Sequence, residues 1–252
     1  MKEVKKRVVL ITGGSSGIGK AMAIQMSSAG SRVIVCGRDR EKLAALKKSY
    51  PEIFVFQADI SNQKDRKDLS DKIDQQFGDL NMLINNAGIK HLIQFDGDTT
   101  FEAKIRQEWE INYMAPQMLT KAFLPLLKKN KGTLVNVTSG LVYVPLAVQP
   151  NYCATKAALH SMTRSLRMQL SDDDINVVEI FYPAVDTPFQ QGMAPDFAIS
   201  PEEAAAAAIK GLNRGKAEIR VGKAGLLYRL SRLMPNKAMR ILNRKAKQSS
   251  RQ

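Results

Sequence analysis

Short apolar segments rich in β-branched residues alternate with segments of helical periodicity along most of the chain. The apolar segments are residues 6–12, 32–36, 53–57, 81–84, 133–138 and 176–181, with a weaker candidate at 218–221. The helical segments are residues 17–29, 40–49, 63–76, 101–128, 153–170 and 201–211. Buried strands that alternate with helices of this length form parallel sheets covered on both faces. The pattern therefore predicts an α/β protein with a doubly wound parallel sheet, three α/β/α layers and a single domain.

A glycine-rich turn follows the first predicted strand, where the sequence reads Thr-Gly-Gly-Ser-Ser-Gly-Ile-Gly from Thr12 to Gly19. Gly13, Gly17 and Gly19 allow a sharp turn and a close approach of the backbone to a ligand. The helix that begins there offers unpaired N–H groups and the positive end of its dipole to an anion. The spacing differs from G-x-G-x-x-G, and it is not a P-loop. Because the turn directly follows a strand, it favours a nucleotide site of Rossmann type over a structural turn.

The end of the second predicted strand indicates which dinucleotide the site would take. An acid at this place binds the ribose 2′-hydroxyl of NAD, whereas arginine accommodates the 2′-phosphate of NADP. Here Gly37 has no carboxylate, Arg38 offers a planar guanidinium, and Ser15 adds a hydroxyl. Asp39 is the nearby acid, one residue past Arg38. The residues favour NADP(H), NAD(H) is the alternative, and an ordinary exposed arginine is the non-functional interpretation.

Four polar residues form a second candidate group. Tyr152 and Lys156 are four residues apart in a helical segment and so project from one face. Ser139 ends the fifth predicted strand, at the sheet edge where ligands bind in open parallel sheets. Asn112 lies inside a long helical segment, in which asparagine is unfavourable. Taken singly, each has an ordinary explanation as a surface pair, a helix cap or a solvated amide.

Taken together, these residues resemble the short-chain dehydrogenase/reductase superfamily over about residues 5–222. Asp59-Ile60 is similar to its adenine-side acid motif, Asn85-Asn86-Ala87-Gly88 to its fourth-strand motif, and the four polar residues to its tetrad. Within the superfamily, residues 217–223 and the basic C-terminal segment resemble the DltE-like oxidoreductases. The resemblance implies a Rossmann fold, hydride transfer between NADP(H) and an alcohol or carbonyl compound, and homodimers or homotetramers.

The predicted site follows from the motifs and the resemblance. The catalytic residues are Asn112, Ser139, Tyr152 and Lys156. The cofactor-binding residues are Gly13, Ser15, Ser16, Gly17, Ile18, Gly19, Arg38, Asp59, Ile60, Asn86, Ala87, Gly88, Tyr152, Lys156, Val185 and Thr187. One departure from the family pattern is Tyr182-Pro183 in place of Pro-Gly after the sixth strand, near the residues expected to hold the nicotinamide carboxamide.

The expected chemistry is proton donation by Tyr152 to a carbonyl oxygen. A lysine ammonium about 4 Å from a phenol stabilises the phenolate, which would lower the tyrosine pKa by up to about three units. Ser139 would position the same oxygen. By the resemblance, Lys156 would also hold the nicotinamide ribose, and Asn112 would hold a water behind Lys156.

Three loops follow the carboxyl ends of strands and are expected to wall the substrate site: residues 88–100, 140–150 and 183–199. Their apolar residues predict an apolar substrate, or else pack the loops against the body. These residues are Leu141, Val142, Tyr143, Val144, Leu146, Phe189, Met193 and Phe197. Residues 189–199 could close as a lid.

The C-terminal segment differs from the rest in charge. Residues 223–252 carry nine basic residues and no acid, in a chain of net charge +14. Leucines at helical spacing predict two short helices divided by Pro235. This segment could pack on the catalytic domain at 1–222, or bind an anionic membrane surface or a partner. We find no motif for nucleic acid.

Composition limits the remaining classes. No apolar run approaches 18 residues, so no membrane span is expected. Two cysteines and two histidines exclude a disulfide framework or a zinc site, so no metal is expected. The expected location is the reducing cytoplasm, with attachment to a membrane surface as the alternative. A non-enzymatic NADP sensor, or a membrane-surface accessory protein that uses its basic segment, is the competing function.

Overall fold

A seven-stranded parallel sheet forms the centre of the molecule. The structure is a computed structural model and describes residues 7–190, 192 and 194–249. The strand order is β3-β2-β1-β4-β5-β6-β7, and neighbouring strands pair in parallel. The strands are β1 (Val8–Thr12), β2 (Arg32–Gly37), β3 (Phe54–Gln57), β4 (Met82–Asn85), β5 (Thr133–Ser139), β6 (Asn176–Tyr182) and β7 (Glu218–Arg220). The predicted doubly wound sheet is confirmed.

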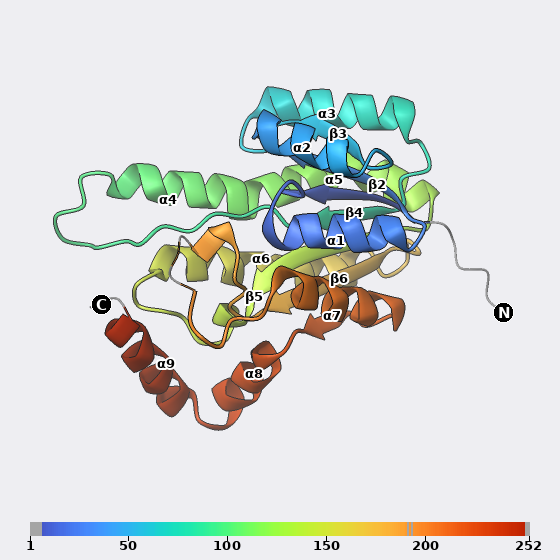
Figure 1. Ribbon diagram of the computed structural model, residues 1–252. Helices are drawn as coiled ribbons and strands as arrows, with labels where there is room; N and C mark the ends of the chain where they lie inside the picture. The colour runs from blue at the N-terminus through green and yellow to red at the C-terminus, as the bar shows by residue number, and fades with distance from the viewer. Residues whose placement is uncertain (1–6, 191, 193, 250–252) are drawn as a thin grey trace.

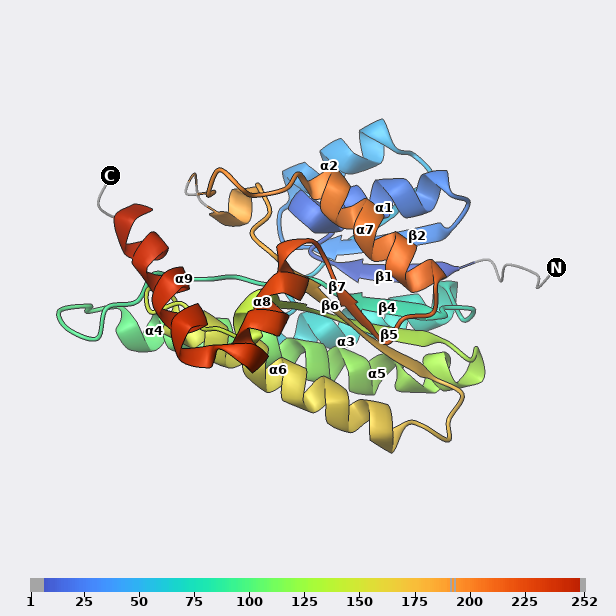
Figure 2. The same cartoon turned by 90° about the horizontal axis from the view of Figure 1, so that it is seen from below.

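Helices cover both faces of this sheet. The helices of the first face are α1 (Gly17–Ser28), α2 (Arg40–Ser49) and α7 (Pro201–Asn213), which share one apolar core with the sheet. The helices of the second face are α3 (Gln63–Gln76), α5 (Ala115–Lys129) and α6 (Pro150–Gln169), packed on a second core. Figure 2 shows α1, α2 and α7 on one side of the strands and α5 and α6 on the other. The three predicted layers and the single domain are therefore confirmed.

The long helical segment predicted at 101–128 contains a local irregularity. It consists of α4 (Phe101–Trp109), a π-helical turn over Glu110–Met114, and then α5. The backbone stays helical through both junctions. A single π turn inside an α-helix widens the helix locally and occurs often at functional sites. Here it carries Asn112, the residue that the sequence marked as unfavourable in a helix.

The reversal of strand order lies between β1 and β4. From β1 the chain moves through β2 to β3 towards one edge, whereas from β4 it moves through β5 and β6 towards the other. Loops leaving the carboxyl ends of β1 and β4 therefore diverge and leave a crevice between them. The glycine-rich turn follows β1 and Asn86-Ala87-Gly88 follows β4, so both predicted motifs border this crevice.

The basic C-terminal segment forms two helices, α8 (Lys223–Leu233) and α9 (Pro235–Ser249). Pro235 is the first residue of α9, as the sequence predicts. Asn243 ties α9 to the loop after β5, because its side chain accepts from the Ala147 amide at 2.6 Å and donates to the Pro145 carbonyl at 3.0 Å. Figures 1 and 2 show the two helices as a V beyond the sheet. In the part of the chain that the structure describes, no helix is long and apolar enough to cross a bilayer.

Candidate active site

A large cleft of about 1850 Å³ opens at the carboxyl ends of the strands. One half is lined by the glycine-rich turn and the ends of β2, β3 and β4; the other by the loops after β4, β5 and β6 together with α8 and α9. The cleft-lining residues include all the predicted cofactor-binding residues together with Ser139. Residues from distant parts of the sequence thus lie around one cleft. Asn112 is the one predicted site residue that does not line the cleft.

Backbone contact between two loops fixes the floor of the first half. A Cβ on Gly13 would lie 2.9 Å from the Cα of Ala87, and one on Gly19 would lie 2.5 Å from Asn86 Nδ2. Asn86 Nδ2 donates to the Thr12 carbonyl at 2.9 Å, and the Ala87 amide donates to the Thr12 hydroxyl at 3.0 Å. Because no Cβ fits at Gly13 or Gly19, these two loops pack closely and form a cradle that the Thr12 and Asn86 side chains hold together.

The start of α1 points its unpaired amides into this cradle. Ser16 is the N-cap residue, and its side chain makes no capping hydrogen bond. Gly17 adopts a φ of +52°, which only glycine takes readily, and a Cβ there would lie 3.2 Å from Thr187 Cγ2. Thr187, from the loop after β6, therefore closes over the glycine-rich turn. This geometry suits an anionic group at the helix N-terminus.

The charged side chains at the end of β2 differ in their hydrogen bonds and ion pairs. Asp39 caps α2 by accepting from the Lys42 amide at 3.0 Å, and its other oxygen lies 3.0 Å from Lys42 Nζ. Arg38 is exposed at the cleft. A Cβ on Gly37 would meet the Ser15 hydroxyl at 3.1 Å, so the hydroxyl lies against this strand end. Lys42 also lines the cleft, a contribution that the sequence reasoning missed.

The predicted adenine-side residues lie at the end of β3. The Asp59 carboxylate accepts from the Ser61 amide at 2.9 Å and from its hydroxyl at 2.7 Å, which fixes its orientation. Ile60 is buried beside it and offers an apolar surface. Both residues line the cleft.

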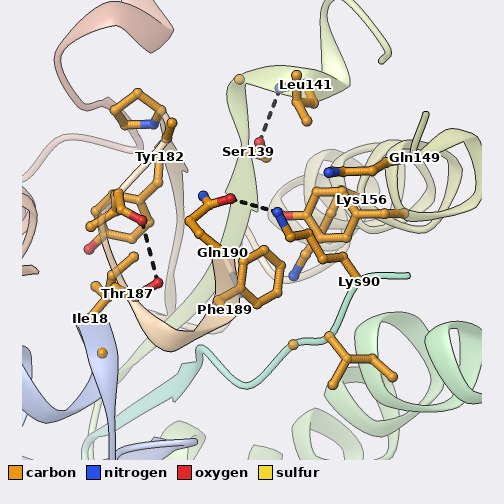
Figure 3. A pocket seen from close by; sticks show the side chains of 18 of the residues that line it. Ile18, Lys90, Ser139, Leu141, Gln149, Lys156, Tyr182, Thr187, Phe189 and Gln190 are labelled. Carbon is orange, nitrogen blue, oxygen red and sulfur yellow. Dashed lines mark hydrogen bonds between the residues drawn. The ribbon is translucent and has the colours of Figure 1, made fainter. Parts of the chain in front are cut away.

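Three of the four predicted catalytic residues meet in the middle of the cleft. Tyr152 and Lys156 come from α6 and are only 7% and 3% exposed; Ser139, at the end of β5, is 8% exposed. Lys156 Nζ donates to the Val137 carbonyl at 3.0 Å, which fixes its position behind β5. The Ser139 hydroxyl accepts from the Leu141 amide at 3.2 Å, and Figure 3 shows Ser139 and Lys156 beside the same opening.

The electrostatics of this group differ from the sequence expectation. Burial raises the pKa of Tyr152, and the hydrogen bond with Ser139 only partly opposes the rise. Burial also lowers the pKa of Lys156 to about 8, against the attraction of Glu179, so its ammonium is itself destabilised. In the protein alone, burial therefore raises the pKa of Tyr152, opposite in direction to the lowering that the sequence analysis expects from Lys156.

Asn112 lies behind the site in the π turn and is fully buried. Its side-chain oxygen accepts from the Ile89 amide at 2.9 Å, and its nitrogen donates to the Ile89 carbonyl at 2.8 Å and to Thr155 Oγ1 at 3.2 Å. The amide thus ties the loop after β4 to the π turn and α6. The sequence context of Asn112 did not reveal these contacts.

The predicted apolar wall is only partly correct. Leu141, Leu146, Phe189 and Phe197 line the cleft. Val142, Tyr143 and Val144 do not, because the 3-10 turn over Gly140–Val142 directs this stretch against the body. Tyr143, for example, stacks on Phe181 with ring centres 5.2 Å apart. Met193 lies outside the described residues.

We call the half with the glycine-rich turn the cofactor half and the half with the loops after β4, β5 and β6 and with α8 and α9 the substrate half. Much of the substrate half comes from residues that the sequence analysis did not assign to it. The loop after β4 contributes Lys90, and the loop after β6 contributes Gln190. The apolar residues that α8, α9 and the residue between them add to this wall are Ala224, Leu226, Leu227, Leu230, Met234, Ala238, Ile241 and Leu242. The spacing of these leucines indicated an apolar stripe, but nothing in the sequence indicated that it faces the cleft.

Comparison with known proteins agrees with this arrangement. The sequence model for short chain dehydrogenases matches residues 7–197. The chain belongs to this family, and it is an oxidoreductase of the short-chain dehydrogenase class.

Individual relatives refine the assignment. The uncharacterized oxidoreductase DltE of Bacillus subtilis is 40% identical over 223 residues, which cover 86% of this chain and 88% of that protein. This similarity confirms the DltE-like resemblance. The 11-beta-hydroxysteroid dehydrogenase-like 3 protein of Arabidopsis thaliana is 31% identical over 86% of this chain and 74% of its own.

Solved structures show the same fold. A short chain dehydrogenase from Burkholderia cenocepacia in complex with NADP superposes with a TM-score of 0.83 and 26% identity, covering 93% of this chain and 96% of that chain. A short-chain dehydrogenase from Sphingobium yanoikuyae in complex with NADPH gives a TM-score of 0.77 and 26% identity, over 85% and 87% of the two chains.

Proposed function

We propose that this protein transfers a hydride between NADP(H) and an alcohol or carbonyl compound. The observation that carries the proposal is the meeting of Ser139, Tyr152 and Lys156 in one buried cleft, directly beside the glycine-rich cradle. A sensor that only bound the nucleotide would have no need for a buried phenol and ammonium at this place. This argument favours an enzyme over the non-enzymatic alternative.

The residues of the first half fit a dinucleotide. The cradle between the turn after β1 and the loop after β4 has no side chain in the way, and the α1 N-terminus supplies amides for a pyrophosphate. Asp59 and Ile60 would border the adenine, and Val185 and Thr187 would hold the nicotinamide carboxamide. The cofactor supplies the hydride when it is bound.

The choice between NADP and NAD rests on the end of β2. Asp39 is engaged by Lys42 and by the helix cap, whereas Arg38 is exposed at the cleft beside the Ser15 hydroxyl. A guanidinium and a hydroxyl suit a 2′-phosphate, so NADP(H) is favoured over NAD(H). The NADP and NADPH in the two solved relatives support the same choice.

The residues of the middle of the cleft then have distinct functions. Tyr152 donates its hydroxyl proton to the oxygen of the reduced carbonyl, and Ser139 donates a hydrogen bond that orients this oxygen. Lys156 stabilises the phenolate that remains and contacts the nicotinamide ribose. Asn112 keeps the loop after β4 and α6 in their relative positions. By family resemblance it also orders a water behind Lys156.

The substrate we propose is largely apolar. Leu141, Leu146 and Phe189 border the reaction centre, and the leucines of α8 extend the same surface outward. Tyr152 itself contacts Phe189, with ring centres 5.6 Å apart. Such a surface favours carbonyl compounds with an apolar chain or ring.

A direct test measures the oxidation of NADPH in the presence of a panel of aliphatic and aromatic carbonyl compounds. We expect turnover with NADPH, weaker turnover with NADH, and alcohol oxidation in the reverse direction. Binding of NADPH without turnover of any carbonyl or alcohol in the panel would instead support the sensor.

We propose two kinds of partner besides the substrate. Met114, Met118 and Met168 are exposed on the helices through which members of the family associate, so we expect a homodimer or homotetramer. Sedimentation of the purified protein tests this, and a monomer at micromolar concentration would contradict it.

The second partner is an anionic membrane surface. Leu233 and Ile241 are exposed on α8 and α9 among the basic residues Arg232, Arg240 and Arg244, a combination typical of interfacial helices. Flotation with phosphatidylglycerol vesicles, with and without residues 223–252, tests this. Binding that persists without these residues, or no binding at all, would contradict it.

A further inference from the structure

Lys90 is a buried lysine that the mechanism does not use. It follows β4 in the loop that begins at Gly88, lines the substrate half of the cleft, and is only 8% exposed. Lysine is rarely buried to this degree unless its charge is paired. A lysine in this position therefore calls for a counter-ion.

The neighbours of its ammonium are uncharged. Lys90 Nζ donates to Gln190 Oε1 at 2.6 Å and lies 5.2 Å from the centre of the Phe189 ring. Both contacts are favourable to a cation, but neither neutralises it, and an ammonium has three hydrogens to donate. Burial lowers the pKa of Lys90 to about 8, with no carboxylate of the described residues opposing the shift.

Among the acidic residues that line the cleft, only Asp196 lies in the substrate half. Asp39 and Asp59 belong to the cofactor half, where Lys42 and Ser61 engage them. Asp196 is an exposed residue of the loop after β6. In the same substrate half, Lys223 lies 4.3 Å from the centre of the Phe197 ring and adds a second positive charge. Besides Lys156, the substrate half is lined by three lysines, Lys90, Lys223 and Lys237, against the single acid Asp196, and this excess of positive charge favours an anion.

The ammonium is also close to the reaction centre. Both groups contact Phe189: its ring centre lies 5.6 Å from that of Tyr152 and 5.2 Å from Lys90 Nζ. Figure 3 shows the Lys90–Gln190 hydrogen bond in the pocket that Ser139 and Lys156 also line. Lys90 and Tyr152 thus share an aromatic neighbour in one cleft, where one small molecule can contact both.

We propose that Lys90, held by Gln190, is the receptor for an anionic group of the substrate, and that the substrate is an oxo acid with an otherwise apolar chain. The carboxylate completes the hydrogen bonding of the ammonium while the carbonyl oxygen lies at Ser139 and Tyr152. The apolar remainder lies along the leucines of α8. This inference rests on the proposed reductase function for the carbonyl, but the carboxylate site itself does not depend on turnover.

The binding test uses hexanoate and hexanamide, which differ in charge but hardly in size. Calorimetry is done on the full chain with and without NADPH. We expect hexanoate to bind about tenfold more tightly than hexanamide, and Lys90→Gln to abolish this preference while keeping a donor for Gln190. Lys216→Gln removes the same charge from an exposed residue outside the cleft and should retain the preference.

The turnover test compares acetoacetate with methyl acetoacetate. We expect the ratio of the two kcat/KM values to favour the acid, to fall about tenfold in Lys90→Gln and to recover in Lys90→Arg.

If Lys90 only fastens the loop after β6 through Gln190, Lys90→Gln lowers both kcat/KM values equally, which would overturn the proposal. Equal binding of hexanoate and hexanamide to the wild type, or binding of neither, would overturn it too. Charge-selective binding without any turnover would keep the carboxylate site and contradict the reductase function instead.

Discussion

The two halves of the cleft are built in different ways. The floor of the cofactor half consists of backbone at the ends of parallel strands, where the residues are small, as at Gly13, Gly19 and Ala87. The substrate half consists of side chains from three loops and two terminal helices, joined by single contacts such as the Lys90–Gln190 hydrogen bond. The sheet therefore fixes the first half, whereas the second depends on how surface segments pack. We expect substitutions in the two halves to separate cofactor binding from substrate selection.

The largest effect is expected where the halves meet. Tyr152→Phe removes the proposed proton donor and should lower kcat by roughly a hundredfold to ten-thousandfold, the usual contribution of a general acid. NADPH binding, measured by quenching of protein fluorescence, should change little. Tyr50→Phe, outside the cleft, is the matched control. Turnover of Tyr152→Phe close to that of the wild type would mean that another group protonates the substrate.

Gly19→Ala is expected to damage the cofactor half selectively. The new Cβ would lie 2.5 Å from both Asn86 Nδ2 and the Gly13 carbonyl oxygen, so the two loops must move apart. We expect NADPH affinity and kcat/KM to fall about a hundredfold, because displacement by about 1 Å at a site is costly. Gly78→Ala, whose nearest neighbour would be 3.7 Å away, should leave NADPH binding unchanged. Normal NADPH binding by Gly19→Ala would show that the two loops can accommodate the new Cβ without damage to the cofactor site.

The pH dependence of carbonyl reduction tests Lys156, the residue proposed to contact the nicotinamide ribose and to stabilise the phenolate. The pKa of Lys156 is lowered to about 8, so its ammonium is present below that pH and is lost as the pH rises through it. Since the proposed mechanism uses the ammonium, kcat/KM for carbonyl reduction should fall roughly tenfold within about one pH unit above that value. Lys156→Arg keeps the charge and should move this limb to higher pH. A profile that stays flat between about pH 7 and 10 would contradict the role of the charge.

Arg38→Ala tests whether the cofactor half distinguishes NADPH from NADH. Loss of the guanidinium should weaken NADPH binding about tenfold or more, since a hydrogen bond to a charged group is worth about 1.5–3 kcal/mol. NADH binding should change far less, because it has no 2′-phosphate. Arg40→Ala, one position beyond Asp39 and outside the cleft, serves as the control. Equal weakening of both cofactors would remove the basis for the NADP preference.

The smallest effect is expected in the substrate half. Leu230 of α8 lines the cleft, so Leu230→Ala should raise KM for an apolar carbonyl compound severalfold through loss of buried apolar surface. The Kd of NADPH should stay the same. Leu233, on the same helix, is 78% exposed and outside the cleft, and Leu233→Ala should have no effect on KM. If both variants behave alike, α8 is not part of the substrate wall.

The difference in construction between the two halves of the cleft also explains which features could be predicted from the sequence. The strands and the main helices were predictable because apolar periodicity is local, and the glycine-rich turn because its spacing follows from backbone geometry at one junction. The contribution of α8 and α9 was not predictable, because an amphipathic helix carries no information about which surface receives it. The turning of Val142 and Tyr143 away from the cleft depends on a single 3-10 turn, which no spacing rule indicates. Burial of Tyr152 and Lys156 likewise reversed an expectation based on charge alone.

The link between Asn243 and the loop after β5 has a practical consequence. One amide near the end of the chain contacts the backbone on both sides of Leu146, a residue of the cleft. An affinity tag or a fusion partner attached behind α9 is therefore connected to that loop through the hydrogen bonds of Asn243. Specificity profiles recorded with carboxyl-terminal tags should therefore be compared with those of amino-terminally tagged protein before any substrate is accepted as native.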